Sequence, residues 1–326
     1  MFRTEIEDIR HPISLTHTDS ILTMGSCFAD EIGNRLSTNK FKVHVNPFGT
    51  VFNPLSLFEL IEGALGSLDG LEDAYLKRDG QYYNYKFHSS VSHESKIGLQ
   101  KHIESKFSQV AQDLKKADVL FLTFGTAWVH EIAKRKLLVT NCHKMPRKEF
   151  NKRLLDVQEI IPAFFTMKEH LQAVNPDLQI VLTVSPVRHT KETLALNNVS
   201  KSVLRLACHY LSDMAEDVHY FPSYEIMLDD LRDYRFYEKD LIHINEQGID
   251  YIWQVFSKTY FSKKTQDLVN EWQSIAKALS HKAFNPKSGK HQQFLRNTLQ
   301  KLEGLQSKLT VKQEIAKVKS QLNING

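Results

Sequence analysis

Short apolar runs alternate with amphipathic stretches along most of the chain. Five apolar runs have the length of buried strands, at 21–24, 42–45, 119–124, 179–184 and 218–221. Segments with the composition or the hydrophobic periodicity of helices lie between these runs and after the last one, at 29–36, 57–65, 96–116, 150–174, 192–215 and 247–256. Strands that alternate with helices predict an α/β fold, a three-layer sandwich around a central parallel sheet.

Two further segments are typical of β-hairpins. Tyr75–Phe87 has aromatic residues on both sides of Asp79-Gly80, a pair that favours a tight turn between antiparallel strands. Trp128–Val139 is the second hairpin candidate. Both lie outside the main strand–helix alternation, so we expect them beside the central sheet.

The C-terminal part differs from the rest. A linker rich in turn residues spans 283–290, and we place the boundary between a main domain, 1–282, and a C-terminal extension, 283–326, at its start. Beyond the linker Leu295, Leu302, Leu309 and Ala316 recur every seven residues. This spacing predicts one amphipathic helix over 294–322, packed on the main body or self-associated with a second copy. From residue 287 on there are eight Lys or Arg against two acids, so the outer face of that helix is basic.

The amino-acid composition favours a globular protein over a nucleic-acid-binding or membrane-spanning one. The 326 residues are 41% hydrophobic and 25% charged, as in a globular domain. A net charge of +4 is too small to indicate nucleic-acid binding, and no apolar run is long enough to predict a membrane span. Three widely separated cysteines suit a reducing compartment, and the N-terminus lacks the apolar core of a secretion signal. We therefore expect a cytoplasmic protein.

Two short motifs carry candidate chemistry. Gly25-Ser26-Cys27 follows the first strand, so the two residues after the glycine would open a helix, where N–H groups stabilise an anion and favour loss of a thiol proton. Asp240 precedes His243 by three residues, close enough to fix one ring nitrogen and leave the other as a base. Taken singly, a buried small-residue turn and a loop that caps a helix are the alternatives.

Taken together, the two motifs resemble the SGNH (GDSL-type) hydrolase superfamily, whose fold is flavodoxin-like. The string from Gly25 to Ala29 also resembles the signature of the GSCFA family within that superfamily. Further strings similar to this family are 46–50, 123–127, 141–144 and 185–187. The resemblance covers about residues 21–261 and leaves the tail outside.

The superfamily pattern consists of short motif blocks along the chain. The resemblance implies roles for the first block, at Gly25–Cys27, the second, at Gly49, and the last, at Asp240–His243. The superfamily serine is the second residue after its glycine, which makes Cys27 the expected nucleophile and Ser26 its rival. The backbone N–H groups of Cys27 and Gly49 are expected in the oxyanion hole. Asp240 and His243 correspond to the aspartate and the base of the last block.

The third block departs from the superfamily pattern. Gly125 matches its glycine, but the asparagine that completes the oxyanion hole is missing. Thr126, Asn46 and Asn141 are the candidates to replace it. Loss of such a donor costs roughly 3–4 kcal/mol of transition-state stabilisation.

Several polar residues remain as substrate contacts. His143 and Lys144 follow the second hairpin, and Arg188 follows the strand at 179–184. A Cys–His pair at 142–143 lacks further ligands at zinc-like spacing, so we expect no metal. No glycine-rich phosphate loop occurs, so we expect no nucleotide cofactor.

These residues favour an esterase that forms a covalent acyl-enzyme on a small-molecule or carbohydrate ester, and the superfamily resemblance implies a carbohydrate acetyl ester as the substrate class. An acyltransferase of the same fold is a close variant. The alternative is a non-catalytic module that kept the scaffold and binds a carbohydrate or a partner. The missing asparagine favours that alternative.

Overall fold

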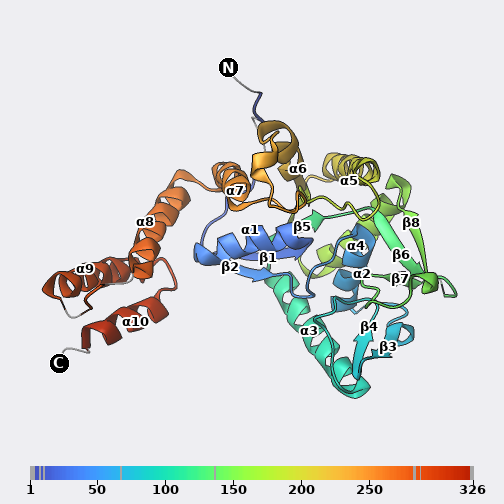
Figure 1. Ribbon diagram of the computed structural model, residues 1–326, viewed down its shortest axis with the longest axis horizontal. Coiled ribbons are helices and arrows are strands. Elements are labelled where there is room, and N and C mark those ends of the chain that lie inside the picture. The colour runs from blue at the N-terminus through green and yellow to red at the C-terminus, as the bar shows by residue number, and fades with distance from the viewer. Residues whose placement is uncertain are drawn as a thin grey trace.

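A central parallel sheet organises the main body. The computed structural model describes residues 4–6, 9, 12–66, 68–135, 137–281, 284–286 and 288–323. The sheet has the order β10-β9-β5-β1-β2, and every pairing is parallel (Figure 1). Its strands are β1 (Ser20–Gly25), β2 (Lys42–Val45), β5 (Val119–Phe124), β9 (Gln179–Val184) and β10 (Val218–Tyr220). All five coincide with predicted strands to within one residue at each end.

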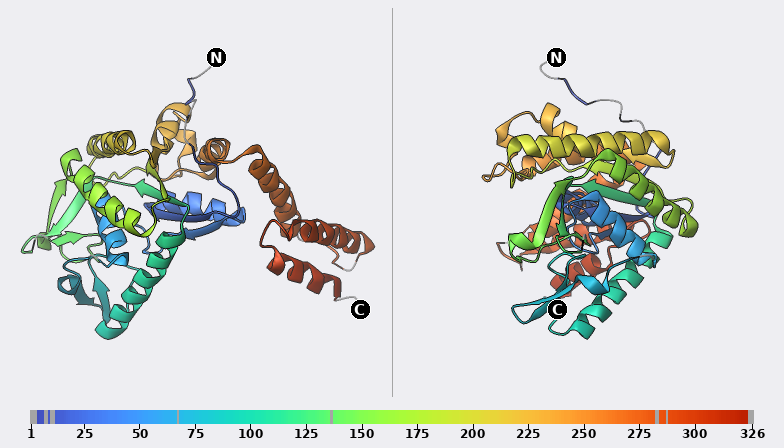
Figure 2. Two further views of the ribbon diagram at one scale, coloured as in Figure 1. Left: turned by 180° about the vertical axis from the view of Figure 1, so that it is seen from behind. Right: turned by 90° about the vertical axis from the view of Figure 1, so that its right-hand side faces the viewer.

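Helices cover both faces of this sheet, which confirms the three-layer α/β fold (Figure 2). One face packs against α2 (Pro54–Ala64), α3 (Lys96–Lys116), α4 (Val157–Val174) and α5 (Leu194–Met214). The other packs against α1 (Cys27–Thr38) and α7 (Glu246–Tyr260). Successive strand residues point to opposite faces, so Leu22 lies in the first core and Ile21 in the second.

Smaller elements complete the body. The first hairpin is confirmed as β3 (Tyr75–Arg78) and β4 (Gln81–Asn84), with positive φ at Asp79 and Gly80. The second is confirmed as β6 (Trp128–Ile132) and β7 (Leu137–Val139). Short helical turns are η1 (Glu72–Ala74), η2 (Arg147–Glu149), α6 (Ser223–Glu225), η3 (Ile226–Asp230) and η4 (Tyr234–Phe236).

One predicted helix begins too early. Phe150–Leu154 forms strand β8, which pairs antiparallel with β6, and α4 starts only at Val157. Asp156 caps α4 in a capping box with Glu159, so the helix has its own start signal after the strand. The prediction of a helix from residue 150 is therefore wrong by seven residues.

The tail forms three helices with a core of their own. They are α8 (Lys263–Ser280), α9 (Gly289–Leu305) and α10 (Lys312–Asn323), and they project from one side of the body (Figure 1). The prediction of one continuous helix is wrong, because the chain turns back after Leu305. Leu295, Leu302 and Leu309 are buried as predicted, whereas Ala316 is exposed, since α10 turns Ile315 and Val318 inward.

The leucines at 295, 302 and 309 thus pack within their own chain, against α8 and α10, and self-association stays a prediction. Trp272 of α8 shares this core and donates from Nε1 to the carbonyl of Thr38 at 2.7 Å. The predicted boundary at 282/283 lies outside the described residues. Within the described part of the chain, no helix is long and apolar enough to cross a membrane.

Candidate active site

Glycine 25 ends β1 in a conformation that only glycine fits. Its φ is +135°, and a Cβ there would lie 2.1 Å from the carbonyl oxygen of Thr123 on β5. The next residue, Ser26, donates its N–H to that same carbonyl at 3.0 Å. The chain therefore turns sharply from the carboxyl end of β1 into the first turn of α1.

Ser26 and Cys27 sit differently at this turn. Ser26 is 0% exposed, and its Oγ accepts the N–H of Phe28 at 3.4 Å as the N-cap of α1. Cys27 is partly exposed and is the first residue of the helix. The N–H groups of a first turn have no acceptor within the helix, so that of Cys27 can face a ligand.

The pKa of the Cys27 thiol is shifted in the direction opposite to the one expected for a helix N-terminus. Burial raises the pKa of Cys27, and the nearby carboxylates of Asp30 and Glu31 raise it further. Lys201 acts in the opposite direction, because its positive charge lowers the pKa of this thiol. The expected easier loss of the proton at a helix N-terminus is therefore outweighed by burial and by the acids on α1.

Asn46 is fully used in holding this turn together. Its Oδ1 accepts the N–H of Gly25 at 2.8 Å, and its Nδ2 donates to Asp30 at 2.8 Å. Thr50 donates to the other oxygen of Asp30 at 3.5 Å. Asn46 thus positions β1 and α1, and one N–H of its amide donates to Asp30.

Gly49 lies in the turn that follows β2. Its N–H donates to the carbonyl of Asn46 at 2.7 Å, and its φ is +77°. A Cβ on Gly49 would lie 2.8 Å from the side chain of His88, which covers this turn. Asp30 and His88 are also close enough for the carboxylate to raise the pKa of the imidazole, although burial lowers it more. His88 is half-buried beside this turn.

The end of β5 is tied to the loop before α2. The N–H groups of Gly125 and Thr126 both donate to the carbonyl of Phe52, at 2.7 and 3.0 Å. The Thr126 hydroxyl lies 3.0 Å from that of Ser200 and accepts the N–H of Trp128 at 3.1 Å. The Thr126 hydroxyl is therefore hydrogen-bonded to other parts of the fold, as the Asn46 side chain is.

Asp240 and His243 form the pair that their spacing predicted. Asp240 Oδ2 lies 2.7 Å from His243 Nδ1, while Oδ1 accepts the N–H groups of Ile242 and His243 at 2.9 and 3.0 Å. These bonds, led by the one to the imidazole, lower the pKa of Asp240 to about 2. The His243 side chain is 56% exposed, and among the described residues nothing is hydrogen-bonded to its Nε2.

Arg188 holds the loop that carries this pair. Its N–H and Nη1 donate to the carbonyls of Ile242 and Leu241, at 3.3 and 3.0 Å. The guanidinium also stacks over the ring of Tyr237 at 4.0 Å. Because Arg188 follows β9, these contacts fix the Asp240–His243 loop near the edge of the sheet where β9 ends.

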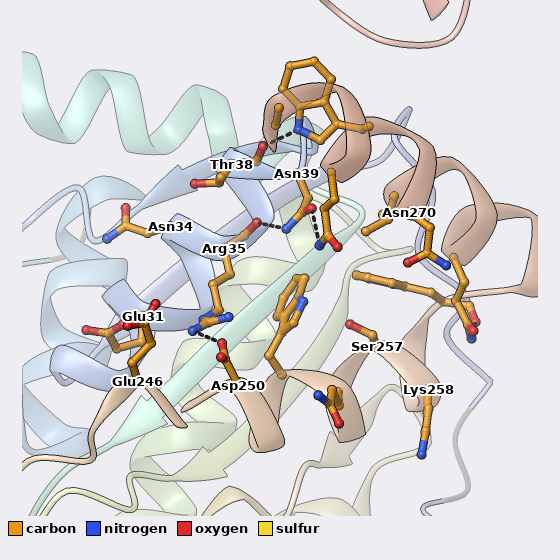
Figure 3. Close-up of a pocket in the computed structure, with 18 residues that line it drawn as sticks. Glu31, Asn34, Arg35, Thr38, Asn39, Glu246, Asp250, Ser257, Lys258 and Asn270 are labelled. Carbon is orange, nitrogen blue, oxygen red and sulfur yellow. Dashed lines mark hydrogen bonds and ion pairs between the residues drawn. The ribbon is translucent and has the colours of Figure 1, made fainter. Parts of the chain in front are cut away.

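Helices α1 and α7, which follow the two motifs in the chain, pack against each other. Arg35 and Asp250 join the helices by an ion pair of 2.6 Å. A groove of about 790 Å³ runs between them and α8, with Glu31 and Glu246 at one end (Figure 3). Glu31 is one helical turn after Cys27, and Glu246 is three residues after His243. The groove is lined by residues that follow each candidate segment in the chain, and Cys27 and His243 themselves are not among its lining residues.

The segment after the second hairpin is built around a buried histidine. His143 Nε2 lies 2.9 Å from the carbonyl of Asn84, and Asn141 Oδ1 accepts the N–H of His143 at 2.8 Å. His143 and Lys144 both have positive φ, at 46° and 56°. Asn141 is thus engaged locally, and only Lys144 of this segment is fully exposed. Across the described residues, no group of three or more His, Cys, Asp or Glu could hold a metal ion.

Comparison with known families decides the identity of the scaffold. A model described as GSCFA family matches residues 20–256. The chain belongs to the GSCFA family. A second model, described as GSCFA domain protein, C-terminal domain, matches residues 272–324. The tail, expected to lie outside the resemblance, is therefore also part of a GSCFA protein.

No curated protein matches this GSCFA chain. Among solved structures it is similar to a family 3 carbohydrate esterase of Clostridium thermocellum, at 11% identity, with 77% of this chain and 97% of that chain covered and a TM-score of 0.33. A carbohydrate esterase family 3 structure from Talaromyces cellulolyticus shows 12% identity, 78% and 99% coverage and a TM-score of 0.31. Likenesses at these scores carry no information on the chemistry of this GSCFA protein.

Two further residues lie behind the GSCFA motif, and sequence reasoning missed the first of them, Lys201. Lys201 of α5 is 1% exposed, and burial lowers its pKa to about 7. His189 is largely enclosed, with a pKa lowered to about 3 by burial and by nearby Lys201, and its Nε2 is buried without a partner among the described residues. A Cβ on Gly125 would lie 3.1 Å from that nitrogen. The signal for Lys201 is present in the sequence, because it falls on the helix face defined by Asn197, Leu204, Cys208 and Leu211.

Proposed function

We propose that this GSCFA protein is an ester hydrolase that forms an acyl-enzyme on Cys27, with a carbohydrate acetyl ester as the expected substrate class. The observation that carries the proposal is the Asp240–His243 pair, whose free Nε2 faces away from the carboxylate. Its loop is fixed near the end of β9, and its helix, α7, is joined to α1, which begins with Cys27. A base oriented by a carboxylate and a nucleophile at a helix N-terminus are the groups that acyl transfer needs.

The reaction proceeds in two balanced halves. His243 Nε2 takes the thiol proton, Cys27 Sγ bonds to the ester carbonyl carbon, and the carbonyl electron pair moves onto oxygen. When that pair returns, the C–O bond breaks and the leaving alcohol takes the proton from His243. Water then attacks the thioester, His243 accepts its proton and returns it to the leaving thiolate, and the carboxylic acid departs.

Exposure favours Cys27 over Ser26 as the nucleophile. Ser26 is fully buried, and its hydroxyl already caps α1. Cys27 is partly exposed, and its backbone N–H is the oxyanion donor we assign. The N–H of Gly49 is held by Asn46, so its part in the oxyanion hole stays a prediction.

One observation favours a second candidate, a non-catalytic binding module. The third-block asparagine is absent, and the side chains of Thr126, Asn46 and Asn141 each make hydrogen bonds within the fold, Asn141 through its oxygen. A scaffold without that donor would retain a binding role with no turnover. Transfer of the acyl group to an alcohol instead of water is a variant of the enzyme, because it uses the same thioester.

Turnover of p-nitrophenyl acetate by four variants tests the proposal. We expect Cys27→Ala and His243→Asn to lose at least about 100-fold in kcat, since each removes a group of the covalent step. Ser26→Ala should keep most activity and lose about 1 kcal/mol of stability with its cap. Cys142→Ala is the matched control and should match the wild type. If only Ser26→Ala loses activity, Ser26 is the nucleophile. If every variant turns over the ester at the wild-type rate, the esterase proposal is wrong and the binding module takes its place.

A further inference from the structure

Lys201 is a buried cation that ties two strand ends together. Its Nζ donates to the carbonyl of Gly125 at 2.7 Å and to that of Ser185 at 2.6 Å. Gly125 and Ser185 directly follow the parallel, paired strands β5 and β9. An ammonium group has three N–H donors, so these two bonds leave one.

A lysine in this place needs an explanation. Burying an ammonium group costs several kcal/mol, and an apolar side chain would satisfy the packing of α5 more cheaply. The two carbonyls offset only part of that cost, since neither carries a full negative charge. The groups close enough to act on Lys201 or to be acted on by it are Cys27, His189 and Tyr224, whose ring centre is 5.8 Å from Nζ.

Cys27 is the one group in this set that becomes an anion during the proposed reaction. The acids on its own helix, Asp30 and Glu31, disfavour that anion, and Lys201 is the positive charge that opposes them. No hydrogen bond links Lys201 to Cys27, so the effect is exerted through space.

We propose that Lys201 is a positioning residue for the nucleophile. It fixes the ends of β5 and β9, to the first of which the Ser26–Cys27 turn is hydrogen-bonded through Thr123, and it places a buried positive charge close enough to Cys27 to favour its anion. The role rests on the proposed function, but the electrostatic part can be measured without any substrate.

Alkylation of Cys27 by iodoacetamide, followed by peptide mass spectrometry from pH 6 to 9, tests this role in the full chain. Lys201→Met keeps the length of the side chain and removes its charge. We expect about a tenfold slower reaction of Cys27 at pH 6.5, with the difference closing above about pH 8.5, where the wild-type amine is neutral. Cys142 in the same molecule is the internal reference, because Lys201 does not act on its pKa.

Lys168→Met is the matched control for loss of a buried lysine. Lys168 is 6% exposed and is paired with Asp217 at 2.9 Å, away from the nucleophile. This variant should alkylate at Cys27 as the wild type does. If Lys201→Met does not fold, Lys201→Gln retains a donor for one carbonyl without the charge and should give the same pH-dependent loss.

The outcomes separate this role from the proposed function. Equal Cys27 alkylation in wild type and Lys201 variants at every pH would overturn the role, whatever the esterase assay shows. A pH-independent change in both Cys27 and Cys142 would also overturn it, because it would indicate general loosening of the fold. The expected pH-dependent loss at Cys27 in a protein without turnover would support the electrostatic role and contradict only the esterase.

Discussion

Asn46 and Asp30 are joined by a hydrogen bond of 2.8 Å, and the same asparagine accepts the N–H of Gly25 at 2.8 Å. One amide therefore connects the end of β1, the turn after β2 and the first turn of α1. Asn46 has a φ of +39°, a conformation that asparagine tolerates better than most residues. The backbone that presents Cys27 depends on this side chain.

Replacement of Asn46 should destabilise the protein in a way that depends on the substitute. Asn46→Ala leaves the buried N–H of Gly25 without an acceptor and removes one of the donors to Asp30, and we expect a loss of about 1–3 kcal/mol in urea unfolding. Asn46→Asp keeps an acceptor for Gly25 but places two carboxylates together, which raises the pKa of the pair in the folded state. Because the folded state then binds protons more tightly than the unfolded chain, Asn46→Asp should regain stability as the pH falls from 7.5 to 5.

Asn34→Ala, at an exposed position of α1, is the control and should stay within about 0.5 kcal/mol of the wild type. An Asn46→Asp variant whose stability does not change with pH relative to wild type would contradict the assigned contact with Asp30.

Loss of the Asp240 carboxylate should reduce turnover at every pH in the working range. Asp240→Asn removes the acceptor that orients His243, and we expect roughly a 100-fold or larger drop in kcat for p-nitrophenyl acetate. Since the pKa of Asp240 is lowered to about 2, the wild-type carboxylate stays ionised from pH 4 to 8. Protonation of Asp240 therefore does not reduce wild-type activity within that range, and the loss in the variant should be present throughout it.

Glu238→Gln, an exposed acid in the same loop, should keep wild-type activity. Activity of Asp240→Asn within threefold of the wild type would show that His243 does not need this partner.

The sheet and its motif could be predicted from sequence because they depend on local signals. β5 and β9 are short apolar runs with polar residues at their ends, and α3 has a regular period, so their bounds were predicted correctly. β8 was missed because nothing in Phe150–Leu154 separates it locally from the helix that follows. Its strand form depends on pairing with β6, a contact that a single segment does not reveal.

The sequence was sufficient to predict which residues form the candidate site, but not most of the hydrogen bonds that they make. Asp240 and His243 are three residues apart, so their contact follows from spacing alone. The engagement of Asn46 depends on Asp30 and Gly25, which lie at other points of the chain. The direction of the Cys27 pKa likewise depends on burial and on Lys201, which α5 brings in from a distance of 174 positions.

Stability should rise with pH above neutrality because of Lys201. The folded state releases the proton of Lys201 near pH 7, whereas the unfolded chain keeps it up to about 10.5. The unfolded state therefore binds more protons between these values, and unfolding becomes less favourable by up to about 1.4 kcal/mol per pH unit. Urea unfolding from pH 7 to 8.5 should show this slope in the wild type and a smaller one in Lys201→Met. Equal slopes in both proteins would contradict the burial of a neutral amine at this position.

The C-terminal helices should stabilise their own core without supporting the chemistry. Leu302 is fully buried between α8, α9 and α10, so Leu302→Ala should cost about 2–5 kcal/mol of local stability. A chain that ends at Lys282 loses α9 and α10 and uncovers Trp272 and Ile275, and we expect it to bind an apolar dye or associate on gel filtration. Gln300→Ala, on the exposed side of α9, is the control for Leu302 and should behave as the wild type.

Ester turnover per folded molecule should stay within about twofold in Leu302→Ala, because the tail meets the body at Thr38 and Lys40, at the opposite end of α1 from Cys27. A larger loss of turnover in a folded Leu302→Ala protein would show that the tail also shapes the site.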